Sequence, residues 1–148
     1  MENTIDTVYS IGEAADLLGV SVPTLRLYER EGLIIPLRKK SGHRRFKNED
    51  LDRIRCLRET INGKKVSIAG IKRLMSLIPC WKIKHCPDEV RDRCSAYSNS
   101  ESACWTLPDR QMECRTANCR ECLVYTRLSD CTSLKATITH YTSSPGPA

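Results

Sequence analysis

Residues 9–46 contain two consecutive helix signals followed by a basic hairpin signal, and few folds accommodate this order. Ser10 and Glu13 have the spacing of a capping box, in which each side chain satisfies a backbone N–H group at the start of a helix. Apolar residues then recur at the spacing of one helical face, and Gly19 can adopt the left-handed conformation that ends a helix. We therefore expect a first amphipathic helix between Ser10 and Gly19.

A second helix is predicted to follow after a short turn. Ser21 is its expected N-cap, Pro23 is tolerated in its first turn, and Gly32 is its expected stop. Leu25 and Tyr28 can then face the core. Two helices joined by a turn of a few residues form a helix-turn-helix, and the second helix of such a pair fits the major groove of DNA.

The segment after the second helix has the pattern of a positively charged β-hairpin. Residues 33–36 are apolar, and residues 38–47 hold six Lys or Arg side chains and no acidic one. Ser41 and Gly42 supply the turn between the strands. A run of like charges is often only a solvated surface, but directly after a helix-turn-helix it indicates contacts with DNA phosphates.

The predicted DNA contacts therefore come from the second helix and the hairpin. They are Ser21, Thr24, Arg26, Leu27, Tyr28, Arg30, Arg38, Lys39, Lys40, His43, Arg44 and Arg45. Thr24 and Arg26 are candidates for reading base edges, and Arg44 is a candidate for phosphate contact. The charge distribution agrees with this prediction, because residues 1–79 hold 15 basic and 10 acidic side chains in a chain of 148 residues with a net charge of +6.

These residues resemble the signature of the MerR family of bacterial transcription regulators over about residues 8–78. The matching positions are Thr24, Leu25, Arg26, Tyr28, Glu29, Gly32, Leu33, Pro36, Arg38, Gly42, His43, Arg44, Arg45 and Phe46. The resemblance implies a winged helix-turn-helix in which the second helix enters the major groove and the wing holds phosphates. It also implies a regulator that bends and untwists a promoter so that RNA polymerase can engage both promoter elements.

Two further helices are expected to complete the first domain. Asn48 is the expected cap of the third helix, and Ser67 is the expected cap of a fourth that stops before Pro79. Cys56 lies beside the inner face of the third helix, where we interpret it as a small buried or half-buried thiol rather than a ligand. No heptad pattern follows Pro79, so the long coiled-coil helix that pairs subunits in most MerR-like proteins is not expected here. Either the second half provides a different dimer contact, or the protein binds DNA as a monomer or as a cooperative array.

Seven of the nine cysteines lie between residues 80 and 122 in an imperfect repeat. Each half opens with a Cys-Trp pair, and in each half a cysteine stands three residues before a tyrosine. This pattern resembles a small "two-CW" module attached to bacterial signalling and regulatory proteins. We expect two related units packed as a pair, with Trp81 and Trp105 supplying most of the apolar surface.

Few aliphatic residues lie in this segment, so it needs a staple in order to fold. A metal ion or an iron–sulfur cluster held by thiolates would provide one, and the spacing of Cys119 and Cys122 suits a metal site. The predicted ligands are Cys80, Cys86, Cys94, Cys104, Cys114, Cys119 and Cys122, with His85 as an optional further ligand. Zinc and an iron–sulfur cluster are rival cofactors, and reversible disulfides or free thiols are the alternative interpretation.

The whole sequence predicts a mainly α protein in three parts. Residues 1–79 form a winged helix-turn-helix of four helices and a β-hairpin wing, residues 80–131 a small irregular cysteine-rich module, and residues 132–148 a loose tail. Cys131 stays unassigned. With neither a membrane-spanning stretch nor the pattern of a secretory signal, the protein is expected in the cytoplasm and away from membranes.

The sequence therefore predicts a DNA-binding transcription regulator whose cysteine-rich half senses metal or redox state. One alternative makes that half a structural or protein-docking module, and another makes the protein an excisionase-like recombination or architectural factor. The expected partners are double-stranded promoter or operator DNA, RNA polymerase, and a second copy held by a contact other than a coiled coil. An enzyme is not expected, since neither a Ser-His-Asp order nor a glycine-rich phosphate loop is present.

Overall fold

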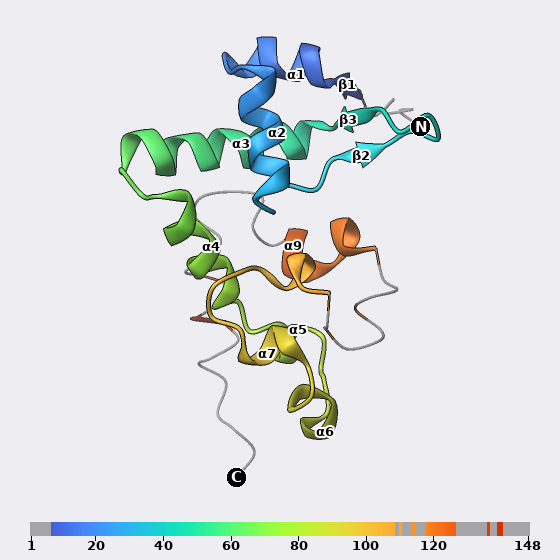
Figure 1. The fold of residues 1–148 in the computed structure, drawn as a ribbon, viewed down its shortest axis with the longest axis vertical. Coiled ribbons are helices and arrows are strands. Elements are labelled where there is room, and N and C mark those ends of the chain that lie inside the picture. Colours follow the sequence, from blue (N-terminus) through green and yellow to red (C-terminus); the bar gives the residue numbers. More distant parts are fainter. Residues whose placement is uncertain are drawn as a thin grey trace.

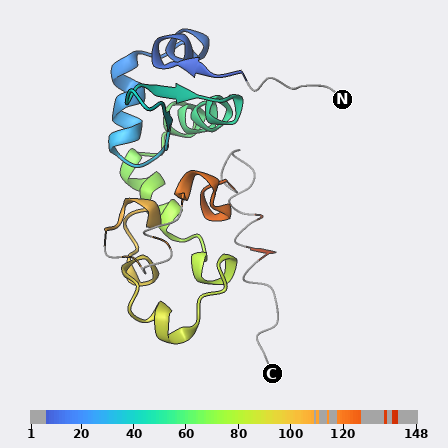
Figure 2. The same ribbon diagram turned by 90° about the vertical axis from the view of Figure 1, so that its right-hand side faces the viewer.

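The computed structural model describes residues 7–108, 110, 114, 118–126, 136, 139 and 140. The described residues are mainly helical, with one small antiparallel sheet of three strands. The helix-turn-helix and the sheet lie at one end of the molecule and the cysteine-rich segment lies at the other, with α4 running between them (Figures 1 and 2). In the part of the chain that the structure describes, no helix has the length and apolar composition that a membrane span requires.

The helix-turn-helix forms as predicted. Its two helices are α1 (Ile11–Leu18) and α2 (Val22–Arg30). The capping box is present, because the Glu13 N–H donates to Ser10 Oγ over 3.2 Å and the Ser10 N–H donates to Glu13 Oε2 over 3.0 Å. Gly19 ends α1 at φ 65°, and Ser21 Oγ accepts the Thr24 N–H over 3.2 Å at the start of α2.

The wing is the antiparallel pair of β2 (Leu37–Arg38) and β3 (Arg44–Phe46), with Leu37 opposite Arg45. Gly42 has φ 86° at the turn, a conformation in which glycine is least strained. The sheet also contains β1 (Tyr9–Ser10), which pairs with β3 so that the strand order is β1-β3-β2. The sequence did not predict β1, because a strand of two residues that ends at a helix cap shows no strand periodicity.

The third helix begins at its expected cap, Asn48, and its observed cap lies one residue earlier. In α3 (Asn48–Arg58) the N-cap is Lys47, whose N–H donates to Asp50 Oδ2 over 2.7 Å, whereas Asn48 Oδ1 accepts a 3.1 Å bond from the Tyr9 hydroxyl. The helix continues to Gly63 as a wider π-helical turn, η1 (Glu59–Gly63). Ser67 caps α4 (Ile68–Ser76) as expected, since its Oγ accepts the Gly70 N–H over 3.0 Å.

After Pro79 the described elements are short, and none of them exceeds four residues. They are α5 (Cys80–Ile83), α6 (Asp88–Arg91), α7 (Ser95–Ser98), η2 (Cys104–Thr106), η3 (Cys119–Glu121) and α9 (Leu123–Thr126). A long dimerisation helix therefore does not occur in the described part of this segment, in agreement with the missing heptad pattern.

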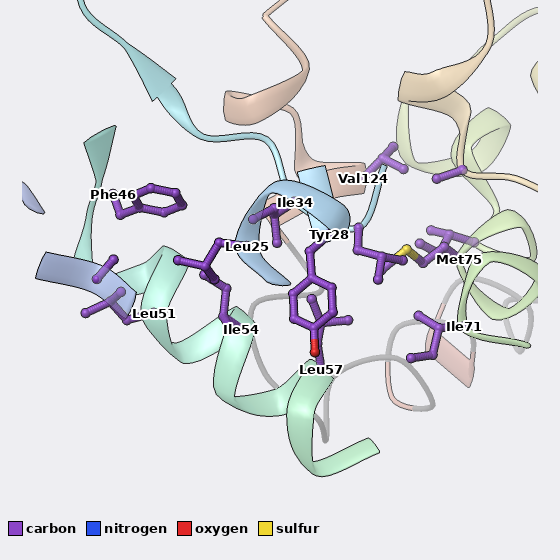
Figure 3. Packing of buried hydrophobic residues seen from close by; sticks show 14 of the residues in the cluster. Leu25, Tyr28, Ile34, Phe46, Leu51, Ile54, Leu57, Ile71, Met75 and Val124 are labelled. Carbon is purple, nitrogen blue, oxygen red and sulfur yellow. The ribbon is translucent and has the colours of Figure 1, made fainter. Parts of the chain in front are cut away.

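One hydrophobic cluster connects the two ends of the molecule. Leu25 and Tyr28 of α2 point toward the face of α3 that carries Leu51, Ile54 and Leu57 (Figure 3). The same cluster extends through α4 to Ile83, Ala103 and Val124 of the cysteine-rich segment, all of which are buried. The cysteine-rich segment thus packs on the helix-turn-helix end, and the division into three parts at residues 79 and 131 stays a prediction.

Cys56 corrects one expectation from the sequence. It is half-buried beside the inner face of α3, but it is disulfide-bonded and does not carry the predicted free thiol. The other cysteines that the structure describes are not in disulfide bonds. Helical spacing cannot reveal such a bond, because it depends on a contact that is remote along the chain. Cys131 and most of the predicted tail also lie outside the described residues.

Candidate DNA-binding surface and cysteine-lined cavity

The predicted DNA contacts on α2 lie mostly on its outer face. Ser21, Arg26 and Arg30 are exposed, and Thr24 and Leu27 are half-buried. The hydroxyl groups of Ser21 and Thr24 are 2.8 Å apart, so they are positioned together at the first turn of the helix. This end of the helix is the end that a recognition helix directs toward base edges.

Tyr28 differs from the other predicted contacts on α2. Only 3% of its surface is exposed, and its ring packs against α3 (Figure 3). It thus fulfils the core role expected of it, and little of its surface is available to DNA.

The basic side chains of the wing surround the hairpin turn. Arg38, Lys39, Lys40 and His43 are exposed, whereas Arg44 and Arg45 on β3 are half-buried. The Lys39 N–H donates to the carbonyl of His43 over 3.0 Å, which closes the hairpin. The exposed cations therefore lie on a defined hairpin, as phosphate contacts require.

Glu29 joins the wing to α2, a role that the sequence analysis did not assign. Its carboxylate accepts a 2.7 Å bond from Arg38 on β2 and forms an ion pair with Arg44 on β3, while its side chain is 17% exposed. Both wing strands are thus tied to the same residue of the second helix. Glu29 is acidic and precedes the run of cations that starts at Arg38. This order of charges is the sequence signal that could have revealed the link.

All seven predicted cysteine ligands line one cavity of about 40 Å³. A water molecule needs about 10–15 Å³ measured in this way, so the cavity has room for more than a single small ion. The first unit of the repeat contributes Cys80, Trp81, Cys86, Cys94 and Tyr97, and the second contributes Cys104, Trp105, Cys114, Cys119, Cys122 and Tyr125. His85 is exposed and is not among the described residues that line the cavity.

A set of thiol donors in an aromatic-lined cavity fits zinc or an iron–sulfur cluster by its chemistry. Among the described residues, no group of three or more His, Cys, Asp or Glu side chains is close enough together to hold a metal ion. The fold therefore gathers the thiols around one space, and ligands would have to move inward to bind a shared metal centre.

Burial opposes thiolate charge at two of the lining cysteines, Cys80 and Cys104. Burial, with smaller contributions from Cys94, Cys86 and Cys114, raises the pKa of Cys80 to about 12. Burial also raises the pKa of Cys104, and Cys80 is the neighbouring thiol that contributes most to this increase. Both groups are therefore neutral near pH 7, and a metal centre that bound them would displace their protons.

The two units repeat the same aromatic geometry. Trp81 and Tyr97 meet edge to face at 4.9 Å and 86°, and Trp105 and Tyr125 meet at 5.1 Å and 85°. An arginine covers each tyrosine. In the first unit it is Arg91, at 5.0 Å from the ring of Tyr97. In the second unit it is Arg53, which comes from α3 and lies 3.8 Å from the ring of Tyr125.

Buried charges connect α3 to the second unit, and sequence reasoning missed them. Asp50 and Arg53 are only 5% and 3% exposed. Arg120 contacts both carboxylate oxygens of Asp50 at 2.6 Å, and although burial lowers its pKa, these bonds raise it overall. Burial lowers the pKa of Arg53. The position of Arg53 three residues after Asp50 and four before Leu57 was the available signal, because this spacing places it on the inner face of α3.

Comparisons with known proteins concern the first half of the chain. Residues 9–78 match the family described as MerR HTH family regulatory protein. The heat-shock protein HspR of Streptomyces coelicolor is 39% identical over 77 residues, which are 51% of this chain and 51% of HspR. The HTH-type transcriptional regulator MlrA of Escherichia coli is 42% identical over 71 residues, which are 47% of this chain and 28% of MlrA.

Among solved structures, this chain is similar to HiNmlR, a MerR family regulator lacking the sensor domain, bound to promoter DNA. The identity is 35% and the TM-score is 0.41, over 45% of this chain and 51% of that chain. The chain thus spans about half the length of HspR and less than a third of MlrA.

Proposed function

Residues 9–78 form a MerR-family helix-turn-helix domain, and from this premise we propose that the protein is a transcription regulator that binds promoter DNA. The outer face of α2 enters the major groove, and the exposed cations of the wing contact the phosphates on either side. The link from Glu29 to Arg38 and Arg44 carries the proposal, because it positions the wing beside α2. A wing held in this way can contact the backbone while the helix reads bases.

DNA selection followed by measurements of salt dependence tests this role. The full-length protein is used to select its sites from a library of random duplexes and from fragments of the genome of its source. Enrichment of promoter sites supports regulation, whereas enrichment of recombination attachment sites would instead support an excisionase-like factor. Failure to enrich any sequence above non-specific binding would overturn the proposal. RNA polymerase and a second copy of the chain stay predicted partners beyond DNA.

We further propose that the cysteine-lined cavity binds zinc or an iron–sulfur cluster and that its occupancy alters DNA binding. Support comes from seven thiols of both units that line the same cavity. When bound, the centre would be held by thiolates and could exchange metal or electrons with its surroundings. The protein itself gathers the thiols, surrounds them with Trp and Tyr rings, and partly buries Cys80 and Cys104.

Anaerobic purification with elemental analysis and an absorption spectrum tests this second part. Zinc would appear as a stoichiometric metal without a visible band, and an iron–sulfur cluster as iron, sulfide and a visible band. Cys104→Ser should lower the bound metal, whereas Lys64→Ala, at an exposed position outside the cavity lining, is the control and should not. Metal in neither form after anaerobic handling and attempted reconstitution would contradict the proposal.

A second candidate role, a permanent structural metal, is favoured by one observation. Ile83, Ala103 and Val124 of the cysteine-rich segment belong to the same buried cluster as the helix-turn-helix, so loss of a staple would disturb the common core. A sensor should load and unload reversibly while the protein stays folded. Circular dichroism during chelation distinguishes the two roles. Unfolding of the protein on loss of the metal would favour the structural role.

A further inference from the structure

The segment that joins α2 to the wing, residues 32–35, is held by side chains of the second Cys-Trp unit. The Trp105 indole N–H donates to the Gly32 carbonyl over 2.6 Å. The Ile35 N–H donates to the Tyr125 hydroxyl over 2.8 Å, and Arg120 donates to the Ile35 carbonyl over 2.6 Å. These bonds tie the backbone of the segment, hereafter the α2–β2 linker, to the walls of the cavity.

The fit at Gly32 leaves no space for a side chain. Gly32 has φ 76°, and a Cβ atom built on it would lie 2.2 Å from Cγ2 of Thr106. Thr106 follows Trp105 in the short helix η2. The helix η2 therefore packs directly against the start of the α2–β2 linker.

The same side chains are joined to the cavity thiols by the chain itself. Trp105 follows Cys104, and Arg120 follows Cys119. The rings of Trp105 and Tyr125 also line the cavity, so each has an apolar surface toward the thiols and a polar atom bonded to the linker. If Cys104 or Cys119 moved toward a bound centre, the adjacent Trp105 or Arg120 would be displaced as well, because close-packed side chains transmit displacement.

Arg53 of α3 strengthens this connection from the other side. It donates to the Leu33 carbonyl over 3.0 Å and to the Tyr125 carbonyl over 2.8 Å, while its guanidinium group covers the Tyr125 ring. One buried arginine thus holds the linker and the second unit together. The corresponding arginine in the first unit, Arg91, belongs to that unit itself and pairs with Asp88.

We infer that the second Cys-Trp unit, through Trp105 and Tyr125, transmits the state of the cavity to the α2–β2 linker and so sets the angle between α2 and the wing. The inference rests on the proposed sensing function and specifies its route. DNA affinity can then change within one chain, without rearrangement of a subunit interface. The first unit completes the cavity but does not transmit.

The test compares DNA affinity in the loaded and unloaded states for matched variants. The full-length protein is loaded with zinc, or anaerobically with iron and sulfide, and unloaded by chelation. For the wild type we expect an affinity ratio in the range of about 5 to 150-fold that is typical of allosteric coupling. Trp105→Phe removes the indole N–H and Tyr125→Phe removes the hydroxyl, and in both the ratio, compared at a metal occupancy equal to that of the wild type, should fall toward one.

Trp81→Phe and Tyr97→Phe are the matched controls, because they make the same changes in the first unit. Both should keep the wild-type ratio. If the second-unit variants keep that ratio, or if the controls lose it equally, the inference is overturned and the sensing function survives. A wild-type ratio of one would overturn both.

Hydrogen exchange gives a readout that does not depend on DNA. The amides of Leu33 and Ile35 should exchange at different rates in the loaded and unloaded wild type, and this difference should disappear in Tyr125→Phe. Identical exchange in both states of a wild type whose DNA affinity does respond to loading would overturn the proposed route. It would leave the regulatory function intact.

Discussion

The ion pair between Asp50 and Arg120 is almost withdrawn from solvent, with side-chain exposures of 6% and 13%. Removal of one partner would leave the other charge buried without its ion-pair partner, which costs about 3–5 kcal/mol. Arg120→Met should therefore lower the free energy of unfolding by about this amount. Denaturant unfolding of Arg120→Met, Asp50→Asn and the double variant measures it, and the double variant should lose less than the sum. Strict additivity would show that the two charges are not coupled.

A comparison of Gly32 with Gly42 separates the effect of close contact from that of backbone strain. Both glycines have positive φ, but only Gly32 is crowded by other atoms. Ala at either position should cost about 1–2 kcal/mol from the left-handed backbone. At Gly32 the added methyl group must also displace Thr106, whereas no atom lies within 4 Å of the Cβ position at Gly42. Gly32→Ala should thus destabilise the protein more than Gly42→Ala in equilibrium unfolding. Thr106→Ser should reduce the difference, and equal losses at both glycines would contradict the crowding.

At the scale of elements, the wing depends on two kinds of cation. Lys40 is exposed near the turn, whereas Arg44 is paired with Glu29. Lys40→Ala should weaken binding to all DNA sequences and reduce the salt slope of the binding constant by about one. Lys64→Ala, at an exposed position on the far end of η1, is the control and should leave the slope unchanged. Fluorescence anisotropy over a range of salt concentrations measures both.

Glu29 provides a test of the geometry of the wing rather than its charge. If charge alone mattered, Glu29→Ala would strengthen DNA binding, because it removes a negative group from a cationic surface. We expect the opposite, because the substitution frees both β2 and β3 from α2. Affinity for the selected site should fall while non-specific binding falls less. A gain in specific affinity would show that the Glu29 ion pairs do not position the wing.

The accuracy of the sequence predictions also differs between elements. The caps at Ser10, Ser21 and Ser67 could be predicted because each depends on residues within one helical turn. The pairing of β1 with β3 and the disulfide of Cys56 depend on partners remote in sequence, which local spacing does not encode. The roles of the DNA-contact residues and of the cysteine ligands stay predictions.

At the scale of the whole molecule, the junction between the two ends was the part that sequence reasoning did not reach. The two halves of the chain on either side of Pro79 show separate sequence patterns. Neither pattern indicates that an arginine of α3 has a partner in the second half. Arg53 and Arg120 instead make buried and partly buried hydrogen bonds across 72 and 70 positions of the chain, respectively. Charged residues within an apolar face were the visible sign that such partners exist.

Metal loading of the whole protein should depend on pH in a definite direction. The pKa of Cys80 is about 12 and that of Cys104 is also raised, so both hold a proton near neutral pH and release it when a metal binds. Metal affinity should therefore increase as pH rises through the range below these pKa values. Competition with a chromophoric chelator at several pH values measures the slope. An affinity that does not change with pH, after correction for the chelator, would argue against binding by these thiols.

The edge-to-face pairs have an optical consequence. The chain contains two tryptophans, one in each unit, and both rings line the cavity. A metal or cluster in that space would lie close to both indoles, so intrinsic fluorescence should report its arrival. In Trp81→Phe the remaining fluorescence comes from Trp105, whose ring is bonded to Gly32. In Trp105→Phe it comes from Trp81 of the first unit. The protein thereby contains two natural probes with which filling of the cavity and movement of the linker can be followed separately in time.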